Sequence, residues 1–331
     1  MRGKDFDSTV LELQRLVFKA VEDTLGDSIL LSGGLDTSII AAIAASVLEV
    51  SEKKKFHTYT VILKEMPGPD LIYSKLVASR FSFPHHIRLV SFSELEAILP
   101  EVIRVLRSFD PMEIRNSVTV YLGLREAKLG GATKVMTGDA SDELFAGYNF
   151  VLKLQRDVAR ATLVHLWEVM HFSSIPLAES LGIEARLPFL ESGVKQFATK
   201  GVDFDYLVGG REVSGELFGK YVLRKAFEDM LPTEIVWRKK TPIEYGSGTT
   251  MLSAIYAEKI KDSDYEGKKR QYLERDGVKL RDKEQLRYYE IYRNLFGGPA
   301  SIDKTLRTCP ACNSKVPDRA VFCTTCGEFP I

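Results

Sequence analysis

The sequence predicts an α/β fold, a parallel sheet with helices on both faces. Short apolar segments with strand composition alternate with longer segments of helical periodicity. This alternation favours a parallel sheet, because parallel strands require crossover connections that are usually helices. Polar loops follow two of the predicted strands, at the edge where such sheets bind ligands. With 331 residues, 45% of them apolar and 27% charged, the chain is long enough for a large buried core.

The elements of the first half follow from periodicity and loop signals. An amphipathic helix is expected at 11–25, then a short buried strand at 28–31 and, after a glycine loop, an Ala- and Ile-rich helix at 39–50. A helix at 93–106 is expected to begin with Ser93 as N-cap and Glu96 completing a capping box. The remaining elements expected here are strands at 56–63, 86–90 and 134–137 and a helix at 71–81.

The second half is predicted to be mostly helical. Helical periodicity extends from about 151 to 231, with a non-helical interruption at 184–190, and a Tyr- and Leu-rich helix is expected around 286–295. Residues 297–299, Gly-Gly-Pro, have the composition of a linker. We therefore expect two domains, 1–298 and 299–331.

Composition excludes several classes of protein. Lys+Arg and Asp+Glu both number 45, and this zero net charge argues against a protein that holds nucleic acid chiefly by neutralising phosphates. No apolar run reaches the roughly 18 residues of a membrane span, and the first residues lack the apolar core of a signal peptide, so a cytoplasmic protein is expected. All four cysteines lie at 309–326, which leaves the rest of the chain without a disulfide or a cysteine nucleophile.

The loop at 32–38, Ser-Gly-Gly-Leu-Asp-Thr-Ser, has the features of an anion site. Glycines let backbone N–H groups close around an anion, and the following helix N-terminus adds its dipole. No Gly-Lys-Ser/Thr follows, so this is not a Walker loop. Asp36 beside a polyphosphate would hold Mg²⁺. The alternative is an ordinary strand-to-helix turn with a capping side chain.

Residues 31–38 resemble the pyrophosphate loop (PP-loop) of the N-type ATP pyrophosphatases. Four later segments, in the family's order, narrow the resemblance to asparagine synthetases and β-lactam synthetases: 137–148, 184–190, 220–227 and 237–250. The resemblance implies the PP-loop fold, also called adenine nucleotide alpha hydrolase-like. It also implies cleavage of ATP to AMP and pyrophosphate, with adenylation of a carboxylate that an amine then converts to an amide.

The resemblance also implies the residues of the site. Asp36 and Asp142 match the family's two Mg²⁺ ligands, one from each polar loop. Lys220 and Lys240 match two catalytic lysines that contact phosphates, although by residue type alone they would be surface lysines. The other nucleotide contacts that it implies are Leu31, Ser32, Gly33, Gly34, Thr37, Ser38, Leu63, Arg115 and Gly138.

Three further positions bear on the substrate. Asp139 occupies a variable position near the acceptor substrate, which is Glu or Tyr in relatives, and is a candidate catalytic residue. Ala140 replaces a usual glycine. The shorter acid at 139 and the added methyl group at 140 are expected to reshape the pocket, so that the substrate need not be aspartate. Glu168 is a possible counterpart of a helical glutamate that orients a tyrosine base in the β-lactam branch, although a helical acid is more often simply solvated.

Asparagine synthetases that use glutamine begin with a glutaminase domain whose nucleophile is an N-terminal cysteine. Here residue 2 is Arg2 and the PP-loop begins at Ser32, so no such domain is expected. The amine donor is then expected to be free ammonia, a small amine, or ammonia from a separate glutaminase.

The C-terminal cysteines form a pattern of their own. Cys309, Cys312, Cys323 and Cys326 make two Cys-x-x-Cys pairs with the spacing of a zinc ribbon. Two disulfides or a rubredoxin-like iron site are the alternatives. The predicted zinc is structural, and the ribbon is a candidate for binding a carrier protein or a tRNA.

Three functions are therefore open. The first is an ATP-dependent, AMP-forming ligase that makes an amide, with ATP, Mg²⁺ and Zn²⁺ as cofactors. The second is a tRNA-modifying enzyme that adenylates a nucleobase carbonyl, and the third is a non-catalytic nucleotide-binding scaffold. The first is favoured because the four segments beyond the PP-loop resemble the amide-forming branch specifically.

Overall fold

The computed structural model describes residues 5–210, 215–299 and 307–331, so Arg2 lies outside the described residues. The chain divides into two compact units. The first comprises 1–60, 69–88 and 123–242, and the second comprises 61–68, 89–122 and 243–331. No helix of the described residues is long and apolar enough to cross a membrane.

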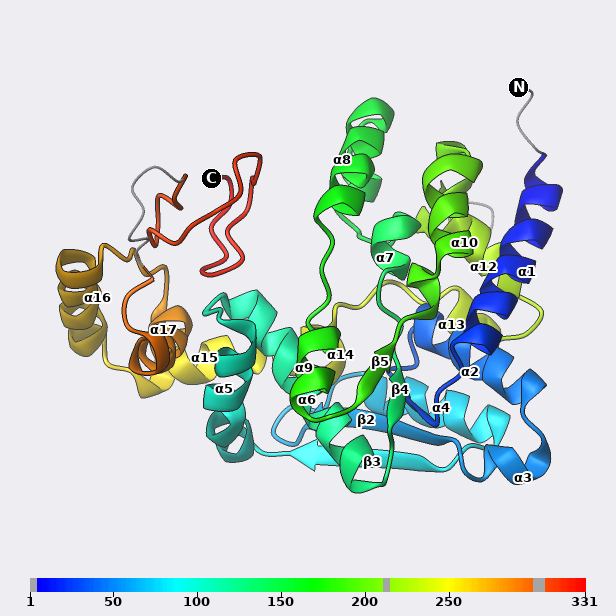
Figure 1. Cartoon of the computed structure of the whole chain (residues 1–331), viewed down its shortest axis with the longest axis horizontal. Coiled ribbons are helices and arrows are strands. Elements are labelled where there is room, and N and C mark those ends of the chain that lie inside the picture. The colour runs from blue at the N-terminus through cyan, green and yellow to red at the C-terminus, as the bar shows by residue number, and fades with distance from the viewer. Residues whose placement is uncertain (1–4, 211–214, 300–306) are drawn as a thin grey trace. The chain divides into compact units, whose positions relative to one another are not determined.

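A five-stranded sheet has the strand order β3-β2-β1-β4-β5 (Figure 1). Its strands are β1 Ser28–Leu30, β2 His57–Leu63, β3 His85–Val90, β4 Lys134–Met136 and β5 Glu184–Arg186. The pairs β1–β2, β1–β4 and β4–β5 are parallel, and helices flank the sheet, which confirms the predicted fold class. β1 and β4 are neighbours, so the two polar loops that follow them leave the same edge of the sheet.

The first unit is mostly helical outside the sheet. Its helices are α1 Phe6–Asp23, α2 Leu35–Val47, α3 Val50–Lys53, α4 Asp70–Phe81, α7 Ser141–Leu144, α8 Arg156–Val169, α9 Ser174–Ser180, α10 Ser192–Gln196, α12 Tyr221–Phe227 and α13 Thr233–Val236. Single turns at Val151–Lys153, Pro188–Leu190, Phe197–Gly201 and Phe204–Tyr206, and a short antiparallel pair, β6 Val208–Gly209 and β7 Phe218–Gly219, complete it.

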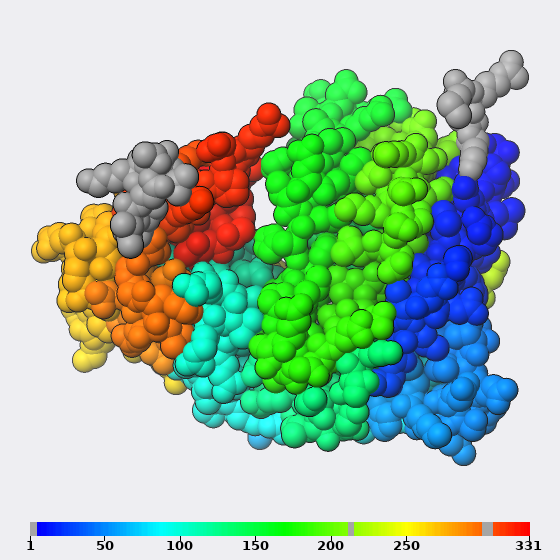
Figure 2. Space-filling view, in the orientation of Figure 1, coloured from blue at the N-terminus to red at the C-terminus, as the bar shows by residue number. Residues whose placement is uncertain are grey.

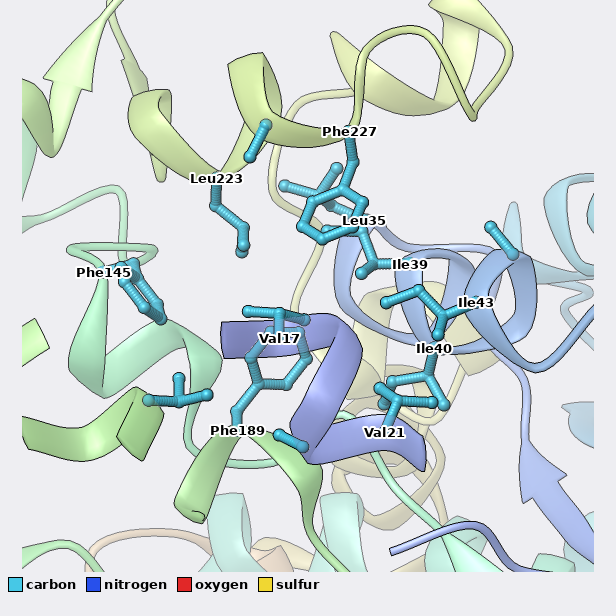
Figure 3. Close-up of a cluster of buried hydrophobic side chains, with 14 of the residues drawn as sticks. Val17, Val21, Leu35, Ile39, Ile40, Ile43, Phe145, Phe189, Leu223 and Phe227 are labelled. Carbon is cyan, nitrogen blue, oxygen red and sulfur yellow. The ribbon is translucent and has the colours of Figure 1, made fainter. Parts of the chain in front are cut away.

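The core of the first unit is built around α2 (Figure 3). Val17 and Val21 of α1, Ile39 and Ile43 of α2 and Phe227 of α12 are completely buried and lie together in this core. α2 also packs against α4 and α13. Because close-packed interiors resist displacement, this burial gives the glycine loop at the start of α2 a rigid support.

Apart from the last residues of β2 and β3, the second unit consists of helices and the cysteine segment, residues 307–331. Its helices are α5 Phe92–Leu106, α14 Ile243–Ser247, α15 Met251–Lys259, α16 Asp262–Asp276, α17 Lys283–Phe296 and the part of α6 Pro111–Leu129 that precedes residue 123. The ring of Phe109 packs edge-on against Tyr289 and Tyr292 of α17, with centroids 5.0 and 5.1 Å apart. Such aromatic packing supplies much of a small core's stability.

Three local features differ from the sequence prediction. α6 was not predicted, and β5 lies in the segment 184–190 that was expected to be only an interruption. The capping box of α5 is formed by Ser91 and Glu94, not by Ser93 and Glu96. Glu96 instead pairs with Arg287, at 2.9 Å, and accepts a hydrogen bond from the Tyr256 hydroxyl. Both serines have the Ser-x-x-Glu spacing. Because β3 ends at Val90, the helix begins directly after it and Ser91 becomes the N-cap.

Candidate active site

The glycine loop joins β1 to the N-terminus of α2. Gly33 has φ +69°, and a Cβ there would lie 2.3 Å from the backbone of Tyr73, so only glycine fits. The Gly34 N–H donates to Ser32 Oγ (3.1 Å), which also lies 3.2 Å from Thr37 Oγ1. Gly34 is the N-cap of α2 and supplies no side-chain cap. The first N–H groups of α2 therefore have the directed dipoles of an anion site.

Four of the predicted residues meet beside this loop, all within the first unit. The Lys220 ammonium donates to both carboxylate oxygens of Asp36 at 2.7 Å and lies 2.7 Å from Asp142 Oδ1. Lys240 Nζ donates to Asp142 Oδ2, also at 2.7 Å. Asp36 is the second residue of α2, and Asp142 lies in α7, which follows β4. The two acids are thus brought together as the parallel sheet predicts.

The spacing of the two carboxylates suits a shared magnesium ion. One cation, the Lys220 ammonium, already contacts both of them at 2.7 Å. Oxygens that share a cation at that distance need only a small shift to share Mg²⁺, which binds oxygen at about 2.1 Å. Each side chain is 15% exposed, so both remain accessible. Asp36 and Asp142 therefore fit Mg²⁺.

Asp142 and Lys240 are charged at neutral pH. Burial alone would raise the pKa of Asp142, but the Lys220 and Lys240 ammonium groups outweigh burial and hold this pKa well below its ordinary value. Burial would lower the pKa of Lys240, but Asp142 and Asp36 outweigh burial and raise it. Opposite charges at hydrogen-bond distance thus preserve both ionised groups inside the unit.

Asp139 lies in the same loop but is held differently. Its Oδ2 accepts hydrogen bonds from Thr137 Oγ1, at 2.8 Å, and from Ser174 Oγ. Burial raises the pKa of Asp139 against these hydrogen bonds. Ala140 has φ +73° and is 1% exposed within the hydrophobic core. Its methyl group therefore packs in the core, and its effect on the substrate pocket stays a prediction.

Two glycine backbones and one serine hydroxyl pack directly against the acids and lysines of this cluster. The sequence analysis did not predict these contacts. A Cβ at Gly147 would lie 2.0 Å from Asp142 Oδ1 and 2.2 Å from Lys220 Cε. A Cβ at Gly138 would lie 3.0 Å from Asp36 Cβ. Ser141 Oγ donates to Asp36 Oδ1 at 2.7 Å. Gly147 and Ser141 both lie within the 137–148 segment, which was the available signal.

Arg238 is a further cation near the glycine loop, and its role was not predicted from the sequence. It donates to Asp70 Oδ1 (2.8 Å), lies over the Tyr73 ring at 4.0 Å, and its Nη1 is 3.5 Å from the Ser32 carbonyl. Only 8% of its side chain is exposed. Its position immediately after Trp237, in the 237–250 segment, was the signal that could have indicated it.

Other predicted residues are not brought into the cluster. Glu168 is exposed on α8, and its carboxylate has no hydrogen bond or ion pair with another described residue. The Ser38 hydroxyl is buried without a hydrogen-bond partner among the residues that the structure covers. Leu63 ends β2, in the second unit. Their roles stay predictions.

Arg115 lies on α6 in the second unit. Its Nη1 donates to Glu284 Oε2 at 3.2 Å, and the Tyr288 hydroxyl donates to Glu284 Oε1 at 2.9 Å. Glu284 is 1% exposed. The Arg115 guanidinium is therefore held by α17, and its contact with a nucleotide stays a prediction.

Glu284 should make the stability of the second unit depend on pH. Burial raises its pKa from 4.5 to about 7, although Arg115 opposes this. Because the folded pKa exceeds the unfolded one, the stabilising contribution is present below pH 4.5 and lost as the pH rises through 7. As the pH rises across this range, we expect the wild type to lose up to about 3 kcal/mol of unfolding free energy relative to Glu284→Gln, measured by urea unfolding. Parallel pH profiles for the two proteins would contradict this.

The predicted cysteine ligands are also brought together. One sulfur each from Cys309, Cys312, Cys323 and Cys326 lies within 4.8 Å of the others, in the second unit. Among the described residues this is the one group of three or more acids, histidines or cysteines close enough to hold a metal ion.

Comparison with known proteins gives a consistent family. The family model described as asparagine synthase matches residues 13–175 and 176–308. Asparagine synthetase B (glutamine-hydrolyzing) of Escherichia coli (strain K12) is 31% identical over 296 residues, which are 83% of this chain and 51% of the relative. A probable asparagine synthetase (glutamine-hydrolyzing) of Schizosaccharomyces pombe is 32% identical over 257 residues, 69% of this chain and 44% of the relative. The chain spans about half the length of these relatives.

Among solved structures, the NMN synthetase from Francisella tularensis aligns with 91% of this chain and 99% of its own length. The TM-score is 0.37 and the sequence identity 12%. At these values the likeness carries no argument, and the fold class rests on the strand order and parallel pairing given above.

Proposed function

Because the chain belongs to the asparagine synthase family, we propose that it is an ATP-dependent ligase that adenylates a carboxylate and then joins it to ammonia or another amine. One observation supports this most. Asp36 and Asp142 share a single ammonium group beside a helix N-terminus that no side chain caps. A nucleotide polyphosphate uses both features, N–H donors for its oxygens and carboxylates for its Mg²⁺.

In the proposed reaction a carboxylate oxygen attacks the α-phosphorus of ATP. The new O–P bond forms as the bond to the bridging oxygen breaks, and pyrophosphate leaves with that electron pair. The amine nitrogen then attacks the acyl carbon, AMP leaves with the C–O electron pair, and the nitrogen loses a proton. Each step develops negative charge on phosphate oxygens, so positioned cations lower the barrier.

The chain's residues would divide this work as follows. The first N–H groups of α2, with Ser32 and Thr37, would hold phosphate oxygens. Asp36 and Asp142 would hold Mg²⁺, which when bound neutralises charge on the departing pyrophosphate. Lys220 and Lys240 would donate to phosphate oxygens, and the acids keep both ammonium groups positioned before ATP arrives.

The substrates are proposed from the relatives. Aspartate is the first carboxylate to test, because the relatives named above are asparagine synthetases. Free ammonia or ammonia from a separate glutaminase is the proposed nitrogen source. A carrier protein or tRNA bound by the cysteine segment is the alternative way of presenting a substrate.

The test is a screen for AMP and pyrophosphate release from ATP and Mg²⁺ with each amino acid, with ammonium or glutamine present. We expect release that depends on one carboxylate and an amide product seen by mass spectrometry. Lys240→Ala should lower the rate roughly a hundredfold. Lys239→Ala is the matched control, because Lys239 is 73% exposed and pairs with Glu216 at the surface.

Two outcomes would overturn this proposal. Release that requires tRNA and no free carboxylate would favour the nucleobase-modifying alternative. ATP binding without release under any condition would favour the scaffold alternative. Equal rates for Lys240→Ala and Lys239→Ala would remove Lys240 from the site.

A further inference from the structure

The four cysteine sulfurs lie within 4.8 Å of one another. Cys309 and Cys326 Sγ are 3.6 Å apart, and Cys312 and Cys323 Sγ are 3.8 Å apart. Zinc bound to four thiolates at about 2.3 Å places the sulfurs about 3.8 Å from one another, whereas a disulfide needs about 2.0 Å. All four cysteines are free and at most 2% exposed. The cluster therefore has the dimensions of a closed metal site.

The cysteine segment, residues 307–331, is attached to α17 and the residues just before it. The Arg281 guanidinium donates to the carbonyls of Cys326 (3.1 Å) and Gly327 (3.0 Å). Gln285 is 1% exposed, and its Nε2 donates to the Cys326 carbonyl at 2.8 Å. In Figure 2 this C-terminal segment, in red, lies against the orange surface. A metal ligand's own carbonyl is thus the acceptor for two side chains of the helical part.

The segment is also attached to the start of α6. The Phe109 N–H donates to the Thr325 carbonyl at 2.7 Å. Gly327 lies directly on Asp110, because a Cβ at this glycine would be 2.2 Å from Asp110 Oδ1. The same Oδ1 accepts the Met112 N–H at 3.2 Å, in the first turn of α6. Residues between the last two cysteines and just beyond them therefore contact both α6 and α17.

We propose that the cysteine cluster binds one zinc ion and that this ion holds α6 and α17 in place, so that the cysteine segment is a clamp within the second unit and not a detachable module. Arg115 lies little more than one turn beyond Asp110 on α6, and its partner Glu284 immediately precedes Gln285 on α17. The clamp thereby fixes the Arg115–Glu284 pair. A weaker affinity for ATP after metal loss would follow only if Arg115 contacts the nucleotide, a consequence that rests on the proposed function.

Two physical reasons make the clamp depend on the metal. A segment this short cannot bury a core of its own, so the free energy of binding zinc to four thiolates becomes its folding free energy. If the segment unfolds, the buried Gln285 amide loses its carbonyl partner, and an unpaired buried donor destabilises the surrounding structure. The exposed Arg281 guanidinium loses its two carbonyl partners as well.

The test measures zinc content and hydrogen exchange in the full chain. We expect about one zinc per chain by elemental analysis. A chelator should raise exchange about tenfold or more at 111–122 and 283–296, whereas α2 should be unaffected. The proposal is wrong if the purified chain holds no zinc, holds iron instead, or if chelation raises exchange only within 307–331.

A variant separates docking from metal binding. Gly327→Ala keeps all four thiolates but places a methyl group against Asp110. We expect it to retain zinc and yet lose exchange protection in α6 and α17. Gly131→Ala is the matched control, since Gly131 also has a positive φ (+88°) but nothing within 4 Å of its added Cβ. Wild-type protection in Gly327→Ala would refute the clamp. These readouts do not depend on pyrophosphate release, so the clamp and the ligase can fail separately.

Discussion

Replacing Asp142 by asparagine is expected to lower pyrophosphate release about a thousandfold or more. Asp142 is the acid that touches both lysines, with Lys220 and Lys240 Nζ each 2.7 Å from one of its oxygens. Asparagine keeps the shape and removes the charge. The site then loses half of its proposed magnesium ligands and the counter-ion that positions Lys240.

The measurement is the rate of AMP formation at increasing Mg²⁺, with thermal unfolding as a check on folding. We expect the variant to remain folded, because Lys220 keeps Asp36 as a partner. Asp205→Asn is the matched control, since Asp205 is 58% exposed and pairs with Arg156 at the surface of the same unit. A folded Asp142→Asn protein with the wild-type rate would show that the two acids do not form the nucleotide site.

The meeting of Asp36 and Asp142 could be predicted because it depends on a general property of parallel sheets. Each acid follows a strand, and the carboxyl ends of parallel strands lie at one edge. The two acids come close because β1 pairs directly with β4, so the loops that follow these strands are neighbours. One hydrogen bond of the resulting site, from Ser141 to Asp36, connects residues 105 positions apart.

Lys220 and Lys240 could not be predicted from residue type. Lys220 is only 3% exposed, which is rare for lysine. The direction of its side chain depends on a left-handed backbone conformation (φ +59°) and on a hydrogen bond from its N–H to the Phe145 carbonyl. These are contacts between distant parts of the chain, which composition and periodicity do not encode. Only the resemblance of their segments to a known family indicated them.

The missed elements also have physical causes. α6 contains β-branched residues and Gly123. It buries Leu122 on one side and Thr119, Leu124 and Ala127 on others, so it shows little amphipathic periodicity. β5 has three residues and is recognisable only through its pairing with β4. Sequence periodicity detects elements that bury one face. It does not detect α6 or β5, because their burial depends on the elements that pack around them.

Replacing Gly147 by alanine is expected to reduce pyrophosphate release roughly a hundredfold, although this residue has no side chain to contribute chemistry. Its φ is outside the left-handed region, so the backbone itself tolerates alanine. The added methyl would meet Asp142 Oδ1 at 2.0 Å, Lys220 Cε at 2.2 Å and the Asp142 backbone at 2.8 Å. Relieving these contacts requires moving an acid and a lysine that now lie 2.7 Å apart.

Overpacking at this point should also lower the free energy of unfolding, by about 2 kcal/mol. Gly267→Ala is the control for the substitution itself, because its added Cβ meets nothing within 4 Å and alanine favours the helix α16. Rates are measured well below the unfolding midpoint of the variant, so that a loss of folded protein does not account for them. If Gly147→Ala retains the wild-type rate there, the contact between Asp142 and Lys220 is not needed for adenylation.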